Sequence, residues 1–100
     1  MKLVNIQPEA LAELAEAEGW YEERLTGLGD EFLDEFLLTV RRIAERPQHY
    51  TITYRDARKT MVNRFPYLVI FIDQPKRIEI VAVVHAHRNP NLWKRRVRDR

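Results

Sequence analysis

The spacing of apolar residues changes at Pro47, and this change constrains the fold more than any other feature of the chain. Between Pro8 and Pro47, apolar residues recur at the three- and four-residue spacing of amphipathic helices. After Pro47, short runs of β-branched and aromatic residues predict strands. A chain ordered in this way is expected to fold as an α+β protein, with paired helices packed on a sheet.

The segment before Pro47 predicts one strand and two helices. Residues 1–6 form a short apolar stretch typical of a strand, and Pro8 begins a helix that is expected to end near residue 25. Two glycines within three residues break the helical pattern, and Asp30 is expected as the N-cap of a second amphipathic helix that reaches Glu45. A short loop between two such helices predicts an antiparallel helical hairpin.

The segment after Pro47 predicts four more strands, at residues 50–54, 60–63, 68–72 and 78–84. The turn residues 73–76 join the last two as a hairpin. Together with the first strand, this predicts a mainly antiparallel sheet of four to five strands with the helical hairpin packed on one face. The chain from 1 to 100 is expected to be a single domain.

Strict alternation along the last strand would separate its apolar side chains into two faces. Ile78, Ile80, Ala82 and Val84 would share one face, and Glu79, Val81, Val83 and His85 the other. Both faces are then largely apolar, which is typical of a central strand. The helical hairpin is expected to cover one face, and the other is left for a second core, a groove or a partner.

The formal net charge of +2 conceals two unlike halves. Residues 1–45 carry four Lys and Arg against eleven Asp and Glu, a net charge of −7. Residues 46–100 carry thirteen Lys and Arg against four Asp and Glu, a net charge of +9, with a basic tail at about residues 92–100. Such a basic half favours nucleic acid or an acidic partner, although two opposite surfaces without any nucleic-acid role would give the same pattern.

The residue types that the chain lacks exclude several chemistries. It has no cysteine and no serine, so it has no nucleophile of either type and no thiolate ligand, and a reducing, cytoplasmic location is expected. His49, His85 and His87 lack a third ligand at a motif spacing, so neither a metal nor a cofactor is expected. No apolar run approaches the roughly 20 residues that span a bilayer, so no membrane partner is expected.

The remaining candidates for chemistry are cationic. Arg88 follows His85 and His87 at the end of the last strand, and further cations lie around the middle strands. Guanidinium groups can clamp phosphates and imidazoles can move protons near neutral pH, so these residues suit either RNA cleavage or binding to an acidic surface. The cations of the middle strands are Arg55, Arg58, Lys59 and Arg64, and the aromatic residues nearby, expected to serve in packing, are Tyr54, Tyr67 and Trp93.

Several short motifs follow one another along nearly the whole chain. They are Trp20–Arg24, Gly27–Gly29 with Phe32, Ile43 with Pro47, Arg64–Tyr67, and Val83–Pro90 followed by Trp93. Their order and spacing resemble the RelE/ParE superfamily of bacterial toxins. The resemblance implies the toxin of a type II toxin–antitoxin, plasmid-stabilisation-like module, which inhibits growth and is neutralised by a cognate antitoxin that wraps it.

The superfamily that the chain resembles divides by target, and we prefer the ParE-like branch, which acts on DNA gyrase without cutting nucleic acid. The segment Ala82–Asn89 is similar to the strand-to-tail signature of that branch, a histidine followed closely by a basic and a small polar residue. This reading implies a gyrase-binding surface made of Arg88, Trp93, Lys94, Arg95 and Arg96. The antitoxin is expected to bind the outer sheet face at Val81 and Val83, together with the acidic helices.

The alternative is the RelE-like branch, whose members cut mRNA on the ribosome. Under this reading the resemblance implies catalytic roles for Arg58, Arg64, His85, His87 and Arg88. Many such nucleases carry a C-terminal tyrosine that helps activate the ribose hydroxyl, and Trp93 stands in its place here. An indole cannot act as a base, so a histidine would have to substitute.

Overall fold

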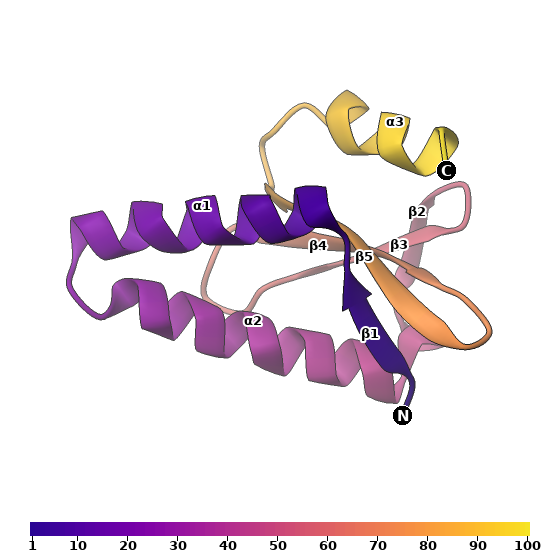
Figure 1. Cartoon of the computed structure of the whole chain (residues 1–100), viewed down its shortest axis with the longest axis horizontal. Coiled ribbons are helices and arrows are strands. Elements are labelled where there is room, and N and C mark those ends of the chain that lie inside the picture. Colours follow the sequence, from indigo (N-terminus) through magenta and orange to yellow (C-terminus); the bar gives the residue numbers. More distant parts are fainter.

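A computed structural model describes residues 1–100 and consists of a five-stranded sheet with helices on both faces (Figure 1). The sheet order is β1-β5-β4-β3-β2, with β1 parallel to β5 and every other pair antiparallel. The elements are β1 (Leu3–Ile6), α1 (Pro8–Arg24), α2 (Leu28–Glu45), a 3₁₀ turn (Pro47–His49), β2 (Thr51–Tyr54), β3 (Ala57–Met61), β4 (Tyr67–Asp73), β5 (Arg77–His85) and α3 (Asn91–Arg98). The predicted α+β architecture is confirmed. None of the helices is long and apolar enough to cross a lipid bilayer.

The predicted helical hairpin is present, but its second helix is not capped by Asp30. Gly27 is the N-cap of α2, with a left-handed φ of 92° that a glycine adopts without strain. The Glu22 carboxylate of α1 accepts hydrogen bonds from the N–H groups of Gly27 and Gly29, each at 3.0 Å. The first helix therefore supplies the capping group, which leaves Asp30 exposed in the first turn of α2.

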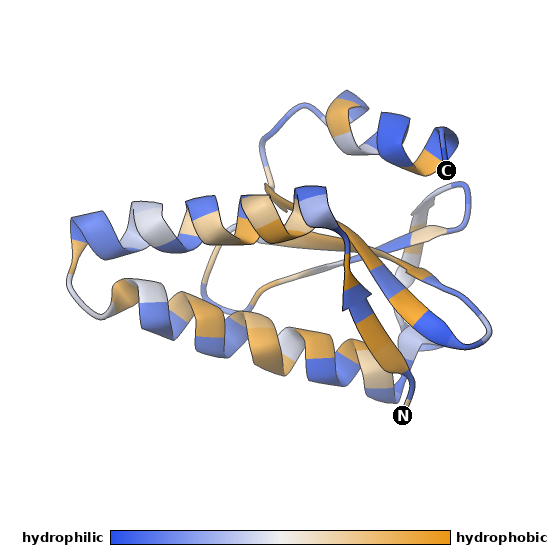
Figure 2. Ribbon diagram, in the orientation of Figure 1, coloured by the Kyte–Doolittle hydropathy of each residue, from blue (hydrophilic) through white to orange (hydrophobic).

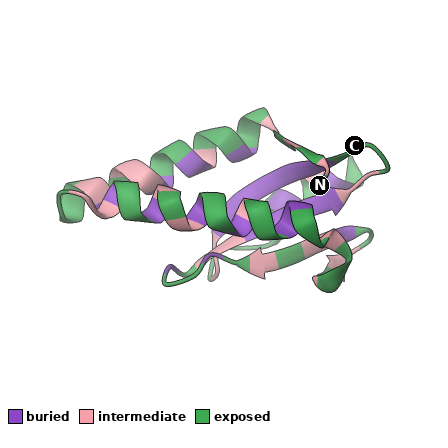
Figure 3. Cartoon of the chain, turned by 90° about the horizontal axis from the view of Figure 1, so that it is seen from below, coloured by how far each residue is buried: buried purple, intermediate pink, exposed green.

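The hairpin covers one face of the sheet with a continuous apolar core. Its helices turn their hydrophobic and buried sides toward the strands (Figures 2 and 3). Tyr21 and Phe32 bring the two helices together over Phe65, with ring centroids 4.9 Å and 5.2 Å from that of Phe65. This core also contains Ile78, Ile80 and Val83 of β5.

A β-bulge in β5 overturns the predicted alternation of its side chains. In the register with β4, Ile70 lies opposite Ala82 and Phe71 lies opposite Ile80, so Val81 has no partner of its own. The extra residue shifts the phase of the side chains, so that Val81 and Val83 lie in different cores.

The expected antitoxin face at Val81 and Val83 is therefore wrong for the free chain. Their side chains are 0% and 1% exposed, respectively. Val83 is covered by the helical hairpin and Val81 by α3, so neither contributes to an open surface.

The second core lies on the other face of the sheet, beneath α3. Trp93 and Val97 are buried there against Ile70, Ile72 and Val84. The stretch described from the sequence only as a basic tail is thus an amphipathic helix with one apolar side. Of the three possibilities left open for this sheet face, the structure has a second core.

Gly29 sets how closely the two hairpin helices approach. A Cβ built at this position would lie 2.8 Å from the Glu18 carbonyl oxygen and 3.0 Å from the Glu22 Cβ. We expect Gly29→Ala to push the helices apart and to lower the free energy of unfolding by about 1–3 kcal/mol. Gly19→Ala is the matched control, because a Cβ there meets nothing within 4 Å.

The control should raise stability by about 0.5–1 kcal/mol, since alanine replaces glycine inside a helix. Urea denaturation followed by circular dichroism measures both changes. The two changes in the free energy of unfolding need not be equal in size. A Gly29→Ala variant as stable as the parent would contradict the close approach of α1 and α2.

Candidate functional site

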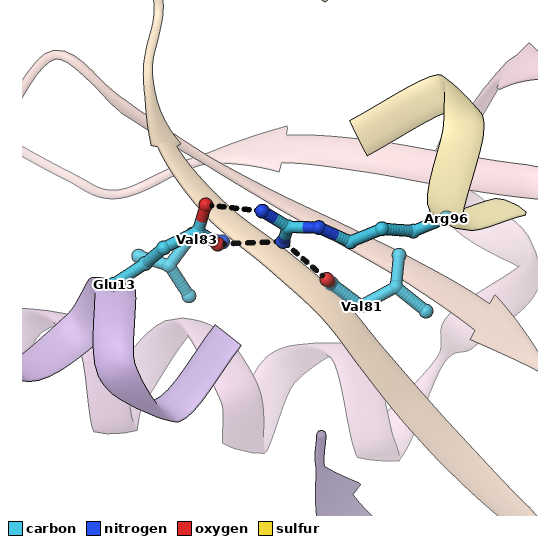
Figure 4. Close-up of polar contacts among 4 residues, drawn as sticks. All are labelled: Glu13, Val81, Val83 and Arg96. Carbon is cyan, nitrogen blue, oxygen red and sulfur yellow. Dashed lines mark hydrogen bonds and ion pairs between the residues drawn. The ribbon is translucent and has the colours of Figure 1, made fainter. Parts of the chain in front are cut away.

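Arg96 fixes α3 to the rest of the protein (Figure 4). Its Nη1 and Nη2 donate to the two carboxylate oxygens of Glu13, in α1, at 2.9 Å and 2.8 Å. Arg96 Nη1 also donates to the Val81 carbonyl oxygen at 3.0 Å, and the Val83 N–H donates to Glu13 Oε1 at 3.0 Å. The hydrogen bond and charge of Glu13 raise the Arg96 pKa.

The residues that follow α3 are held by the β2–β3 turn. Arg100 Nη2 contacts both carboxylate oxygens of Asp56 at 2.8 Å. Nearer the start of α3, Trp93 is buried, and its indole meets Tyr54 of β2 edge-on with ring centroids 6.2 Å apart. The helix is therefore held at a fixed orientation on the sheet, with Trp93 and Val97 facing the second core.

The structure divides the five predicted gyrase-contact residues into two groups. Trp93 and Arg96 are used within the chain, in the second core and in the Glu13 ion pair. Arg88, Lys94 and Arg95 take part in none of the ion pairs in the structure. Their charges remain available to a ligand, and we call these three residues together with Lys59 of β3 the cationic face.

Two clefts meet at Lys94. One has a volume of about 240 Å³ and is lined by Lys59, His85, Arg88, Trp93 and Lys94 together with apolar strand residues. The other has a volume of about 470 Å³ and is lined by Tyr54, Asn91, Lys94, Arg95 and Arg98. Both are open, strongly cationic depressions, which suits the binding of an anionic macromolecular surface better than the enclosure of a small molecule.

Tyr54 belongs to this site, although the sequence predicts only a packing role for it. Arg55 Nε donates a hydrogen bond to the Tyr54 hydroxyl at 3.3 Å, and Lys94 Nζ lies 5.3 Å from the ring centroid. The Arg55 hydrogen bond, with the charges of Arg55, Arg98 and Lys94, lowers the Tyr54 pKa. The neighbouring Tyr54-Arg55 pair is visible in the sequence, but the contact with Lys94 exists only in the folded chain.

Arg58 and Arg64, both predicted for an RNA-cleaving site, are engaged elsewhere. Arg58 Nη1 donates to the Tyr50 carbonyl oxygen at 2.8 Å. Arg64 pairs with Glu31 of α2 at 2.8 Å, and its Nη1 lies 3.6 Å from a Glu35 carboxylate oxygen. The guanidinium groups thus support the backbone before β2 and the loop before β4, respectively.

His85 and His87 do come together, at the end of β5. Their ring centroids are 5.5 Å apart, and the His87 N–H donates to His85 Nδ1 at 3.1 Å. His85 also meets the Tyr67 ring at 5.5 Å, and burial of that phenol raises the Tyr67 pKa. Of the predicted RNA-cleaving set, only these histidines and Arg88 share one part of the surface, and no cluster of three or more potential metal ligands occurs.

The fold and the cationic face define a small α+β protein with an exposed surface suited to an anionic partner. Residues 4–90 match the family model described as ParE toxin of type II toxin-antitoxin system, parDE, and the chain belongs to that family. A solved structure described as the chromosomal ParDE TA system from P. aeruginosa is similar, with a TM-score of 0.72 and 17% sequence identity. The match covers 85% of this chain and 96% of that one, and shows a shared fold. No curated protein matches the chain.

The lowered Tyr54 pKa can be tested by titration. We expect one tyrosine to deprotonate at lower pH than free tyrosine, and Tyr21 and Tyr67 to deprotonate at higher pH because burial raises their pKa values. Ultraviolet absorbance at a wavelength where tyrosinate absorbs follows this titration. Tyr54→Phe should remove the earliest phase, which is the one that occurs at the lowest pH. Lys94→Gln should move that phase to higher pH. An earliest phase that survives Tyr54→Phe would contradict the assignment.

Proposed function

We propose that this chain is a growth-inhibiting toxin that acts on DNA gyrase in the cytoplasm and is neutralised by a cognate antitoxin. The observation that carries the proposal is the cationic face, where Arg88, Lys94 and Arg95 have no ion-pair partner in the chain. Membership of the ParE toxin family supports the toxin role.

The rigid attachment of α3 supports binding rather than catalysis as the mode of action. Lys94 and Arg95 lie on a helix held by the buried Trp93 and by Arg96, and Arg100 anchors the residues that follow it, so little ordering of the backbone is required when a target binds. Uncompensated charges on such a surface accelerate encounter with an acidic partner and orient it. The target is therefore expected to present carboxylates or phosphates toward α3.

The alternative of mRNA cleavage has less support from the geometry. A nuclease site needs a general base, a general acid and cations around one phosphate. His85, His87 and Arg88 are close together, but Arg58 and Arg64 hold a carbonyl oxygen and two carboxylates. The candidate acid–base groups therefore lack the two arginines that the resemblance assigned to the phosphate.

Neutralisation by an antitoxin is proposed to use the same charges. An antitoxin segment that covers the cationic face would need acidic residues, which would also prevent access of the target. An extended segment that folds on binding could follow α3 and cross both clefts at Lys94. The free chain offers no such role to the side chains of Val81 and Val83, because both are buried.

A supercoiling assay with purified gyrase tests the proposal. The parent chain should inhibit supercoiling, and Lys94→Glu/Arg95→Glu should need about tenfold more protein for the same inhibition, because two free cations become repulsive. The control is Arg42→Glu/Arg46→Glu, which reverses two exposed charges near the end of α2 and should inhibit like the parent. Circular dichroism must show that both variants are folded.

Three results would contradict the proposal. Supercoiling that is unaffected by the parent chain would remove gyrase as the target. Phased cuts in a translated mRNA, detected by primer extension after brief expression of the chain, would establish cleavage instead, and we expect the message to stay intact. Equal inhibition by the α3 variant and the parent would place the contact outside the cationic face.

A further inference from the structure

The outward side of α2 carries two adjacent leucines in water. Leu37 and Leu38 are 59% and 45% exposed, on a helix whose opposite side packs into the main core. They line a shallow depression of about 340 Å³ whose only other lining residues are Asp34 and Arg41. Single exposed leucines are ordinary, but two at the centre of a depression that is closed at each end by a charge are a specific arrangement.

The spacing of the four residues is that of a helix-packing hole. Asp34, Leu37, Leu38 and Arg41 occupy positions i, i+3, i+4 and i+7 of α2, and four residues at these positions receive one side chain from a facing helix. A leucine of a second helix fits this role. The depression is therefore shaped for helix-on-helix contact rather than for an extended strand or a small molecule.

The charges of Asp34 and Arg41 indicate which partner fits the depression. Neither Asp34 nor Arg41 has an ion-pair partner within the chain. When two copies of α2 lie antiparallel about a two-fold axis between positions 37 and 38, Leu37 faces Leu38 of the second copy. The same axis brings Asp34 opposite Arg41 of the second copy, and this pair occurs twice.

We propose that this face of α2 binds a second copy of the chain, with the two α2 helices antiparallel. A two-fold interface requires one patch to complement itself, and an acidic, apolar, basic order along the helix meets that requirement. An antitoxin that neutralises the cationic face has no need of such symmetry. The proposal does not depend on the gyrase proposal, because α2 and α3 cover opposite faces of the sheet.

The same axis also shows what limits the affinity. It brings Asp30 toward Glu45 of the second copy, a like-charge pair at each end of the contact. Two leucines per copy bury far less area than a standard stable interface of about 1,600 Å². The dimer is therefore expected to be weak and to form at micromolar or higher concentration.

Charge reversal provides the test, measured by sedimentation velocity on the full chain from about 5 µM to about 500 µM. The parent should show a concentration-dependent dimer. Asp34→Arg and Arg41→Asp should each weaken it about tenfold, since each creates two like-charge pairs, and the double variant should restore parental affinity within about threefold. Arg42→Asp, at the adjacent position but outside the depression, is the matched control and should behave like the parent.

Leu38→Lys should abolish the dimer while circular dichroism shows an unchanged fold, because the side chain is already half in water. A parent chain that stays monomeric throughout the range would overturn the proposal and leave this face to a different protein. A dimer that persists in Leu38→Lys, or that the double reversal fails to restore, would place the interface elsewhere. None of these outcomes bears on inhibition of gyrase by the cationic face.

Discussion

The arrangement of the whole chain depends on how side chains satisfy the backbone along one unpaired stretch of the edge of β5. β1 pairs with β5 only as far as Ile6 and Ile80, so the following residues of β5 have no strand beside them on that side. The bulge at Val81 lies in this stretch. Unpaired backbone groups in a protein interior are costly. Glu13 and Arg96 satisfy the Val83 N–H and the Val81 carbonyl oxygen, and bind each other as well.

This bridge links helices that lie on opposite faces of the sheet. Glu13 comes from α1 and Arg96 from α3, and their ion pair crosses the edge of β5 between them (Figure 4). The orientation of α3 follows, since Trp93 and Val97 then face the second core while Lys94 and Arg95 face away from it. The cationic face proposed to bind the target is thus a consequence of the way the sheet edge is closed.

Much of the fold could be predicted from the sequence, because it rests on periodicity. The helical hairpin and the β4–β5 pair have long, regular apolar patterns, and both are present. The helix α3 was missed because its eight residues include few apolar side chains beneath a dense run of charge. The bulge was missed because an unpaired residue leaves no mark in a uniformly apolar strand.

Only part of the candidate site could be predicted from the sequence. The sequence identifies where cations are numerous, so it names Arg88, Lys94 and Arg95 as candidates, and these three form no ion pair in the structure. It does not identify which cations are neutralised by tertiary contacts, since Glu13 lies 83 positions before Arg96. Arg64, Arg58 and Arg96 look as free as Lys94 in the sequence, and Tyr54 gains its role only when α3 packs beside it.

The most direct test of the central claim is amide hydrogen exchange at Val83, measured by NMR together with the free energy of unfolding. In the parent, the Val83 amide should be as protected as its neighbours in β5. Arg96→Met should lower stability by about 2–3 kcal/mol and expose this amide to local exchange, while Arg95→Met, next to it on α3, should do neither. Equal stability and equal Val83 protection in the two variants would contradict the account.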